Sequence, residues 1–197
     1  MKCSTGGEAA AKALIDLGVE YVFTLTGGHL NHIHMHLEGS PVKLIGTRHE
    51  QGATFMADAY GRMTGRPGVA MLTAGPGFTN ALTPIMHALF CNTPLLVIAG
   101  AAGIEHRDKL DLQDAPQIAA VTPMVKKAFV CTQASRVAEY VEMAYRTAYT
   151  GRPGPVFLEL PCDVLGAAIP GGEAPYFKTE VHSQPVDREA AAKTLEI

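Results

Sequence analysis

The sequence predicts an α/β fold: a three-layer, doubly wound and mostly parallel sheet with helices on both faces. Two observations predict it. Apolar segments of strand length alternate along the chain with longer segments of helical periodicity. The strand segments, such as LLVIA at 95–99, are continuously apolar rather than alternating. Continuous apolar strands are typical of parallel sheets whose two faces are both covered, and the helices are then the crossover connections.

In the first third of the chain, a helix is expected to begin near Thr5 and to end at Gly18. Thr5 and Glu8 have the spacing of a capping box, and apolar residues follow at helical spacing. The next expected elements, in order, are a strand over 21–24, a turn at 27–28, a helix over 29–37, a strand over 42–45 and a helix over 49–63.

The rest of the chain continues the alternation. The expected elements are a strand over 69–72, a turn at 75–77, a helix over 78–90, a strand over 95–99, a loop over 100–111, a short strand over 127–130, a helix over 136–149 and a strand over 156–160. The sequence TGRPG occurs at 64–68 and at 150–154, each time between a helix and a strand. Glycine caps the helix and proline prevents its continuation, so we interpret the pair as one loop used twice.

Three regions follow from this pattern. Residues 1–168 are expected to form one domain, and residues 169–186 are expected to be a linker because they are rich in Pro and Gly. Residues 187–197 are interpreted as the start of a truncated following domain. Asp187 could cap a helix there that has nothing left in the sequence to pack against.

The composition narrows the classes of function. The chain has 197 residues, 47% of them hydrophobic, with a net charge of −3 and no basic block, which argues against nucleic acid as a partner. No run approaches the ~18 apolar residues of a membrane span, and the N-terminus is a poor signal peptide. The four cysteines lack zinc or CxxC spacing, so we expect reduced thiols in a cytoplasmic protein.

Polar side chains gather after three of the predicted strands, in the segments 24–29, 46–50 and 73–77. Ligands of open parallel sheets bind at the carboxyl ends of the strands. Glu50 is the only acid in these segments and begins a helix, where the helix dipole favours a carboxylate. It is either a functional acid or simply a helix-terminal one. The glycines at 75–77 are likewise either a phosphate cradle or a tight turn.

Four histidines lie close together, at His29, His32, His34 and His36. His32 and His36 are four residues apart and could share one face of a helix. No nearby acid completes an HExxH pattern, and alternate histidines point to different sides of a helix. We therefore expect no metal site in this chain, and a histidine-rich surface helix instead.

Five segments carry a family resemblance: YVFTLTGGHLNHI, TRHEQGATFMADAYGRMTG, GVAMLTAGPGFTNALTPIMHA, TPLLVIAG and GRPGPVFLELPCDV. Together they resemble the N-terminal pyrimidine-binding domain of the thiamine-diphosphate (thiamine pyrophosphate) enzymes that include benzaldehyde lyase, acetolactate synthase and 2-hydroxyacyl-CoA lyase. The similarity extends to about Asp163. The combination of RHE, A-D-AYGR and TAGPGFTN is specific. Benzaldehyde lyase is the most similar of these enzymes at His29 and Gln113.

The resemblance implies catalytic roles for three residues. Glu50 corresponds to the glutamate that hydrogen-bonds the aminopyrimidine ring, shifting it to the imino form that deprotonates the thiazolium carbon. His29 and Gln113 correspond to polar groups beside the reacting carbon, where they move protons or orient the substrate oxygen. The cofactor-binding residues implied by the resemblance are Glu50, Thr26, Gly27, Gly28, Thr73, Pro76, Gly77 and Asn80.

Departures from the family pattern limit what can be carried over. Benzaldehyde lyase has a second histidine where this chain has Thr26, so its substrate preference does not transfer. Acetolactate synthases commonly have a flavin-contacting arginine where this chain has Thr122, so FAD is not expected. The family holds the diphosphate and Mg²⁺ on a separate domain through a GDG motif and a downstream Asn, and this sequence contains neither.

The resemblance therefore implies part of a lyase or carboligase acting on acyloins, 2-oxo acids or 2-hydroxyacyl-CoA. The isolated chain is expected to be inactive and to need a diphosphate-binding domain or subunit as its partner. A homo-oligomer is also expected, with no nucleic-acid or membrane partner. The alternative is a non-catalytic fragment or split subunit that only binds a partner or self-associates.

Overall fold

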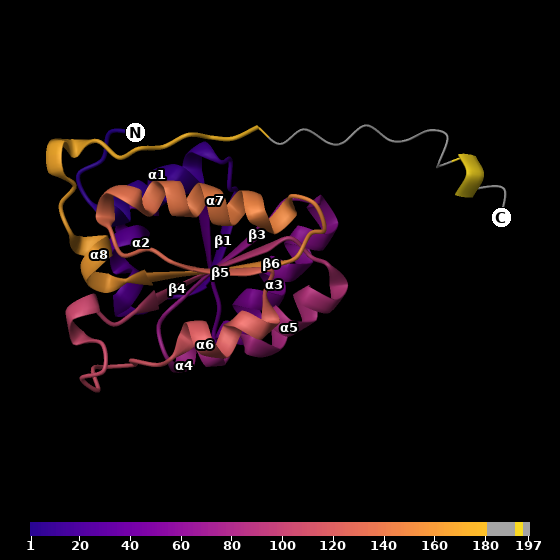
Figure 1. The fold of residues 1–197 in the computed structure, drawn as a ribbon, viewed down its shortest axis with the longest axis horizontal. Helices are drawn as coiled ribbons and strands as arrows, with labels where there is room; N and C mark the ends of the chain where they lie inside the picture. The colour runs from indigo at the N-terminus through magenta and orange to yellow at the C-terminus, as the bar shows by residue number, and fades with distance from the viewer. Residues whose placement is uncertain (181–191, 195–197) are drawn as a thin grey trace.

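The computed structural model describes residues 1–180 and 192–194 and contains one six-stranded sheet (Figure 1). Its strands are β1 (Tyr21–Leu25), β2 (Lys43–Gly46), β3 (Gly68–Leu72), β4 (Leu95–Ala101), β5 (Lys127–Val130) and β6 (Pro155–Pro161). They lie in the order β2-β1-β3-β4-β6-β5, and every pairing among them is parallel. The predicted doubly wound α/β fold is confirmed.

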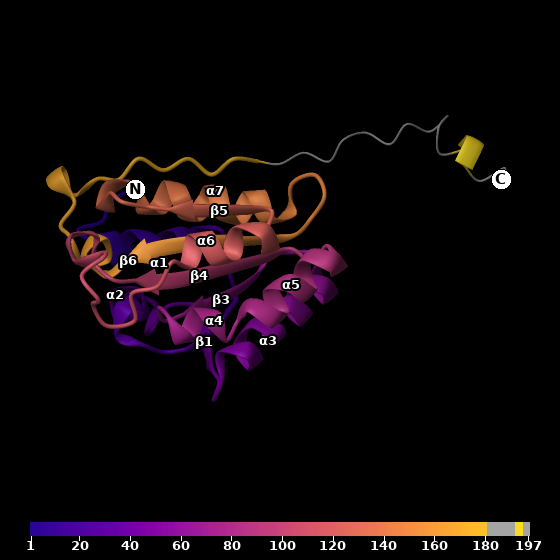
Figure 2. The same cartoon turned by 60° about the horizontal axis from the view of Figure 1, so that its bottom comes forward.

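Helices form a layer on each side of this sheet (Figures 1 and 2). One layer contains α1 (Gly6–Asp16), α2 (Asn31–Leu37), α7 (Val137–Tyr149) and α8 (Cys162–Gly166). The other contains α3 (Glu50–Thr64), α4 (Pro76–Thr79), α5 (Leu82–Cys91) and α6 (Gln117–Val121). Short 3₁₀ turns complete the connections: η1 (Gly28–Leu30), η2 (Ile104–His106), η3 (Thr122–Met124), η4 (Ala134–Arg136) and η5 (Pro170–Gly172).

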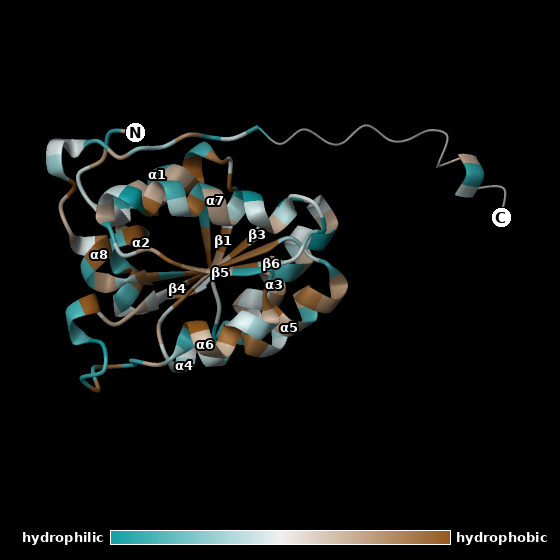
Figure 3. Ribbon diagram, viewed as in Figure 1, coloured by the Kyte–Doolittle hydropathy of each residue, from teal (hydrophilic) through white to brown (hydrophobic). Residues whose placement is uncertain are grey.

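The core is divided by the sheet into two apolar clusters. Along β3, Val69 and Met71 belong to the cluster under α1 and α7, and Ala70 and Leu72 belong to the cluster under α3 and α5. All four side chains are fully buried. The interior strands are drawn mostly in brown in Figure 3, the colour of hydrophobic residues. Burial on both faces explains why the strands read as unbroken apolar runs.

The helix predicted over 78–90 is two helices, α4 and α5, separated at Asn80 and Ala81. Pro84 supplies the physical reason. A continuous helix needs the amide of residue 84 to donate to the carbonyl of Asn80, and proline has no such amide. Pro84 instead lies in the first turn of α5, where that donor is not required.

Smaller differences concern helix starts and short helices. Thr5 caps α1 by accepting from the amide of Glu8 at 3.2 Å, but the Glu8 carboxylate binds Ser4 rather than Thr5, so only half of the capping box forms. The helix predicted from His49 begins one residue later, because His49 is the N-cap of α3. The short helices α6 and α8 had no predicted counterpart.

The described part of the predicted linker lies along the domain, beside the N-terminus. The amide of Ile169 donates to Ser4 and the amide of Ala174 donates to Met1, at 2.8 and 2.9 Å. Beyond these, the Tyr176 hydroxyl donates to Asp16 at 2.9 Å. The helix predicted from Asp187 lies outside the described residues except for 192–194. In the described ranges, no helix has both the length and the apolar character needed to cross a bilayer.

Candidate functional site at the carboxyl ends of the strands

Three predicted segments meet at one edge of the sheet. Strand β3 lies between β1 and β4, so the segment after β1 and the segment after β3 are neighbours. The chain reaches Glu50 by leaving β2 at Gly46 and entering α3 on the same side. The topology therefore brings together strand ends that are far apart in sequence, as expected for ligand sites of parallel sheets.

Glu50 is the central acid of this site. It is the first residue of α3, and although it is a carboxylate it is only 7% exposed. Its Oε2 accepts a 2.9 Å hydrogen bond from Nδ2 of Asn80, at the break between α4 and α5. Its Oε1 accepts no hydrogen bond from the described part of the chain. One oxygen is thus held by the protein, and the other has no hydrogen-bond partner among the described residues.

Two glycines create space beside this carboxyl group. A Cβ at Gly77 would lie 2.6 Å from Cγ2 of Thr73 and 3.4 Å from Oε1 of Glu50. A Cβ at Gly27 would lie 2.4 Å from Cβ of Thr73. Both contacts with Thr73 are closer than packed atoms tolerate, so these positions require glycine. At Gly28, by contrast, a Cβ would meet nothing within 4 Å.

His29 and Gln113 are joined through Thr73. The distance from Nδ1 of His29 to Oγ1 of Thr73 is 3.0 Å, and Oγ1 donates to Oε1 of Gln113 at 3.3 Å. Because the threonine hydroxyl has one proton and gives it to Gln113, the proton of this contact belongs on Nδ1 of His29. Nε2 of a neutral His29 is then unprotonated and able to accept a proton.

The backbone conformation at three positions places the side chains of His29 and Gln113. A Cβ at Gly100, on β4, would lie 2.4 Å from Cβ of His29, so glycine is needed for the histidine to seat against the strand. Gly75 has φ of 57° and turns the chain from β3 into α4. Gln113 is itself in the left-handed region, with φ of 62°. Its side chain reaches Thr73 from an irregular loop.

Gln117 is a site residue that the sequence pattern did not predict. It is only 2% exposed, and its side chain makes three hydrogen bonds within the described residues. Its Oε1 accepts from the amide of Gly75 at 2.9 Å, and its Nε2 donates to the carbonyl of Gly100 at 2.9 Å and to Oε2 of Glu159 at 3.0 Å. Gln117 thus ties the turn after β3 to β4 and β6. No motif surrounds it in the sequence.

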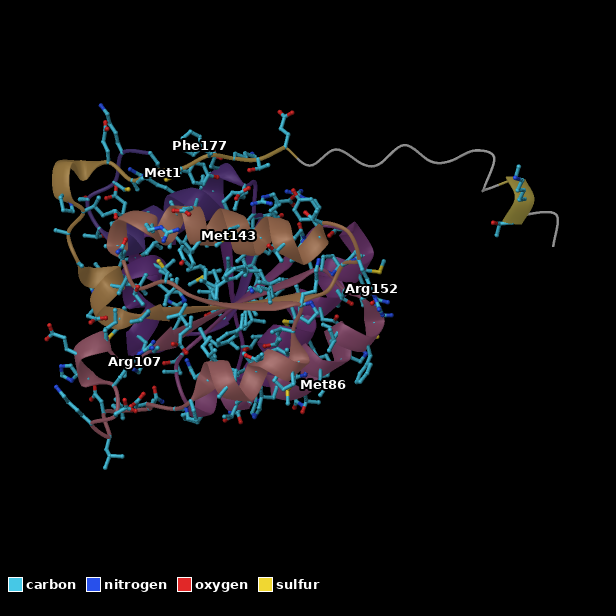
Figure 4. All side chains as sticks on the ribbon, viewed as in Figure 1. Met1, Met86, Arg107, Met143, Arg152 and Phe177 are labelled. Atoms are coloured by element: carbon cyan, nitrogen blue, oxygen red, sulfur yellow. The ribbon has the colours of Figure 1, made fainter. Side chains whose placement is uncertain are left out.

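A cavity of about 500 Å³ opens next to Gln113 and Gln117, above the ends of β4 and β6. Its charged lining includes Arg107, which donates to Oε1 of Glu159. Figure 4 shows Arg107 at this end of the sheet. Because Glu159 also accepts from Gln117, its carboxylate is satisfied by two donors although it is nearly buried.

The remaining predicted residues lie at the rim of the site. Thr26, Gly28 and Pro76 are exposed, and none of their side chains takes part in the contacts described above. Their roles, like the catalytic roles of Glu50 and His29, remain predictions. In the part of the chain that the structure describes, no group of three or more His, Cys, Asp or Glu side chains is arranged to hold a metal ion.

Of the four neighbouring histidines, His34 points inward. Its Nδ1 lies 3.0 Å from the carbonyl of Leu30, and its Nε2 lies 3.2 Å from Oγ1 of Thr24 on β1. Burial lowers the pKa of His34. This side chain therefore belongs to the packing between α2 and the sheet, whereas the expected surface exposure holds for His32 and His36.

Comparison with known proteins shows consistent similarity. The family described as "Thiamine pyrophosphate enzyme, N-terminal TPP binding domain" matches residues 4–121. The 2-hydroxyacyl-CoA lyase 2 of Danio rerio is 41% identical over 160 residues, covering 81% of this chain and 26% of that protein. The same enzyme of Homo sapiens is 38% identical over 183 residues, covering 91% of this chain and 27% of that protein.

A second kind of relative is also similar. The acetolactate synthase large subunit of Buchnera aphidicola is 36% identical over 166 residues, covering 84% of this chain and 29% of that protein. The chain therefore spans between 26% and 29% of the length of these three relatives.

Proposed function

This chain belongs to the thiamine pyrophosphate enzymes as their N-terminal TPP-binding domain, and from that premise we propose that Glu50 activates the pyrimidine ring of bound thiamine diphosphate. The observation that carries the proposal is the carboxyl group of Glu50. This group is buried, and its Oε2 accepts a hydrogen bond from Asn80. Its Oε1 faces the space that the absence of a side chain at Gly77 leaves open. When bound, the cofactor supplies a nucleophilic carbon and an electron sink for chemistry next to a carbonyl group.

The chain's own residues divide the work in this proposal. Glu50 exchanges a proton with the ring at Oε1, while Asn80 keeps the carboxyl group in one orientation. Gly27 and Gly77 give the ring room to approach. His29, with its proton on Nδ1, accepts or returns a proton through Nε2 on the substrate side. Gln113 orients the substrate oxygen at the mouth of the cavity.

The complete enzyme, in this proposal, is a lyase or carboligase that acts on acyloins, 2-oxo acids or 2-hydroxyacyl-CoA. The names of the relatives support this class, since one kind is a 2-hydroxyacyl-CoA lyase and the other an acetolactate synthase. We propose that the enzyme uses no flavin. Position 122 has a threonine, and its hydroxyl donates internally to the carbonyl of Ile118.

We further propose that the diphosphate and its Mg²⁺ are held by another domain or subunit, and that the protein is a homo-oligomer. Exposed apolar side chains on the helices around Glu50 support a contact surface there. Phe55 and Met56 lie one turn or more beyond Glu50 on α3, and Phe90 is 76% exposed at the end of α5. A cytoplasmic location is supported by four free cysteines.

The test is proton exchange at the thiazolium carbon of the cofactor, followed by NMR in deuterated buffer with the chain assembled with its diphosphate-binding domain. The variant Glu50→Gln keeps the shape but cannot exchange a proton as a carboxyl group does, so we expect a rate loss of about a hundredfold. Glu38→Gln, on an exposed acid at the end of α2, is the matched control. A Gln variant that exchanges as fast as the parent contradicts the assignment. If the assembled parent protein does not accelerate proton exchange over that of the free cofactor, the non-catalytic alternative is favoured.

A further inference from the structure

Three side chains on α3 and α5 form a chain of contacts away from the candidate site. Sγ of Cys91 lies 3.6 Å from Nε2 of His87, which is one turn earlier on α5. Nδ1 of the same ring lies 3.1 Å from Oδ2 of Asp58 on α3. Acid, imidazole and thiol are thus arranged in the order in which a carboxylate orients a histidine and the histidine accepts a proton from a nucleophile.

The burial of these groups is graded from inside to outside. The Asp58 side chain is 4% exposed and the His87 side chain is 42% exposed, while Cys91 is open to solvent. Oδ1 of Asp58 is buried and has no hydrogen-bond partner in the described part of the chain. Its other oxygen, Oδ2, lies against Nδ1 of His87, so the buried carboxyl group fixes the orientation of the ring and leaves Nε2 directed at the sulfur.

Two further contacts hold the arrangement. The ring of Phe55 packs edge-on against the ring of His87, with centroids 5.7 Å apart. Nη1 of Arg62 lies 3.9 Å from Sγ of Cys91. A cation beside a sulfur favours the thiolate, which is the nucleophilic form of cysteine. Arg62 and His87 approach the sulfur from two different helices.

The position of Cys91 in its own helix acts in the opposite direction. Cys91 is the last residue of α5, and the negative end of a helix dipole disfavours an anion. Any activation of this thiol must therefore come from His87 and Arg62. The geometry does not suit a metal ion, because the carboxylate and the sulfur contact opposite nitrogens of one ring and cannot converge on one point.

We propose that Cys91 is a reactive thiol that forms a reversible mixed disulfide with low-molecular-weight disulfides such as oxidised glutathione. The thiol proton moves to Nε2 of His87, and the thiolate attacks one sulfur of the disulfide. A new bond forms between Sγ and that sulfur, and the original disulfide bond breaks. The departing thiolate takes the proton from His87. Cysteine is oxidised, the small disulfide is reduced, and a free thiol reverses the reaction.

The other three cysteines are poorly placed for this chemistry. Cys3 and Cys131 are buried, and burial raises the pKa of both thiols. Cys162 is partly buried at the start of α8 and serves as the internal control. The site shares no residue with the cofactor site. Asp58 is eight residues beyond Glu50, about 12 Å along α3 at the helical rise.

The test is the rate of reaction with dithiodipyridine, which releases a coloured product, followed by peptide mapping with oxidised glutathione. Both are run on chain diluted until it is monomeric, because Phe90 of the proposed contact surface is the neighbour of Cys91. We expect one thiol of the parent chain to react at least about tenfold faster than free cysteine, and the map to place the adduct on Cys91. Cys91→Ser should remove the fast reaction and Cys162→Ser should retain it. A reducing thiol should restore the parent mass.

Two variants test the mechanism of activation. His87→Gln removes the base and should slow Cys91 by about tenfold or more. Arg62→Gln, on an exposed residue whose change should leave the fold intact, should slow it several-fold. Circular dichroism checks the fold of both. The proposal is overturned if the fast reaction survives in Cys91→Ser, or if both folded variants react as fast as the parent.

Discussion

Nδ2 of Asn80 donates a 2.9 Å hydrogen bond to Oε2 of Glu50, across the gap between two helices on the same side of the sheet. The contact depends on the break between α4 and α5. In one continuous helix Asn80 would be an interior residue, and the absence of an amide on Pro84 prevents that helix. A proline thus sets the orientation of a carboxyl group 34 residues away in the sequence.

Asn80→Ala should slow the cofactor proton exchange described above without unfolding the chain. The substitution removes the only protein donor to the side-chain carboxyl group of Glu50 in the described residues, so this group is free to rotate. Loss of one hydrogen bond to a charged group is worth about 1.5–3 kcal/mol, or a rate change of about tenfold or more. Thr79→Ala, on the exposed neighbour, is the control. Equal exchange rates in Asn80→Ala and parent would remove Asn80 from the mechanism.

Adjacent glycines should respond differently to alanine. Gly27→Ala places a Cβ 2.4 Å from Thr73, so we expect it to lower the free energy of unfolding by about 1–3 kcal/mol. Gly28→Ala meets nothing within 4 Å and should change it by less than about 0.5 kcal/mol. Urea denaturation of both variants measures the difference. Equal stabilities would show that Thr73 moves aside at no cost.

The strands of the sheet could be predicted from the sequence, because a strand that is buried on both faces is a continuous run of apolar residues. The continuous apolar runs at 69–72 and 95–99 became central strands, and their order in the chain predicted parallel pairing. The sequence pattern failed where a structural feature depends on residues outside the local segment. The break at Asn80 depends on a proline four residues later, and the helix over 78–90 was predicted straight through it.

The same distinction applies to the site. The sequence placed Glu50 and the glycines at 27 and 77 at the ends of strands, because they lie in segments directly after predicted strands, and the structure brings Gly27 and Gly77 together around Thr73. Their functional roles stay predictions. Gln117 was not found, because it lies in a short helix and acts through tertiary contacts with Gly75 and Glu159. The pattern TGRPG predicted two helix ends from local chemistry alone, and Gly65 and Gly151 do have positive φ.

Two glutamines four residues apart provide a matched pair. Gln117→Leu should lower the free energy of unfolding by about 2–4 kcal/mol, because it leaves the amide of Gly75 and an oxygen of Glu159 without their partner in the interior. Gln113→Leu should cost less than about 1 kcal/mol, since Gln113 is partly exposed and its side chain accepts one long hydrogen bond within the described ranges. Thermal or urea unfolding distinguishes them. A Gln117 variant as stable as the Gln113 variant would refute the structural role.

The acid stability of the chain should depend on Glu8. Lys12 and Ser4 lower its pKa from the ordinary 4.5 to about 2. Because the folded value lies below the unfolded one, the contribution to stability is complete above pH 4.5 and is lost as the pH falls toward 2. Glu8→Gln should therefore be about 1 kcal/mol less stable than the parent at neutral pH, with the difference closing in that window.

The control for Glu8 is Glu20→Gln. Glu20 forms a more exposed ion pair with Arg66, so its removal should cost less than about 0.5 kcal/mol. Denaturation midpoints measured at several pH values test both variants. A stability difference for Glu8→Gln that persists undiminished at pH 2 would mean that the charge of Glu8 is not its source.

The isolated chain should self-associate through the outer faces of α3 and α5. Met63 and Phe90 are 85% and 76% exposed on these helices, and exposed apolar surface of this kind drives association. Sedimentation velocity at tens of micromolar should show a dimer or a larger species.

Adding a charge within the contact, by Met63→Glu or Phe90→Glu, should weaken association by about tenfold or more because the charge must lose its water. Phe177→Glu changes a residue that is 84% exposed on the C-terminal segment and should leave the distribution unchanged. In Figure 4, Phe177 lies on the opposite side of the sheet from α5, which makes it a suitable control for added charge alone. A parent chain that sediments as a single monomer at this concentration would contradict the prediction, and equal effects of all three substitutions would move the contact away from α3 and α5.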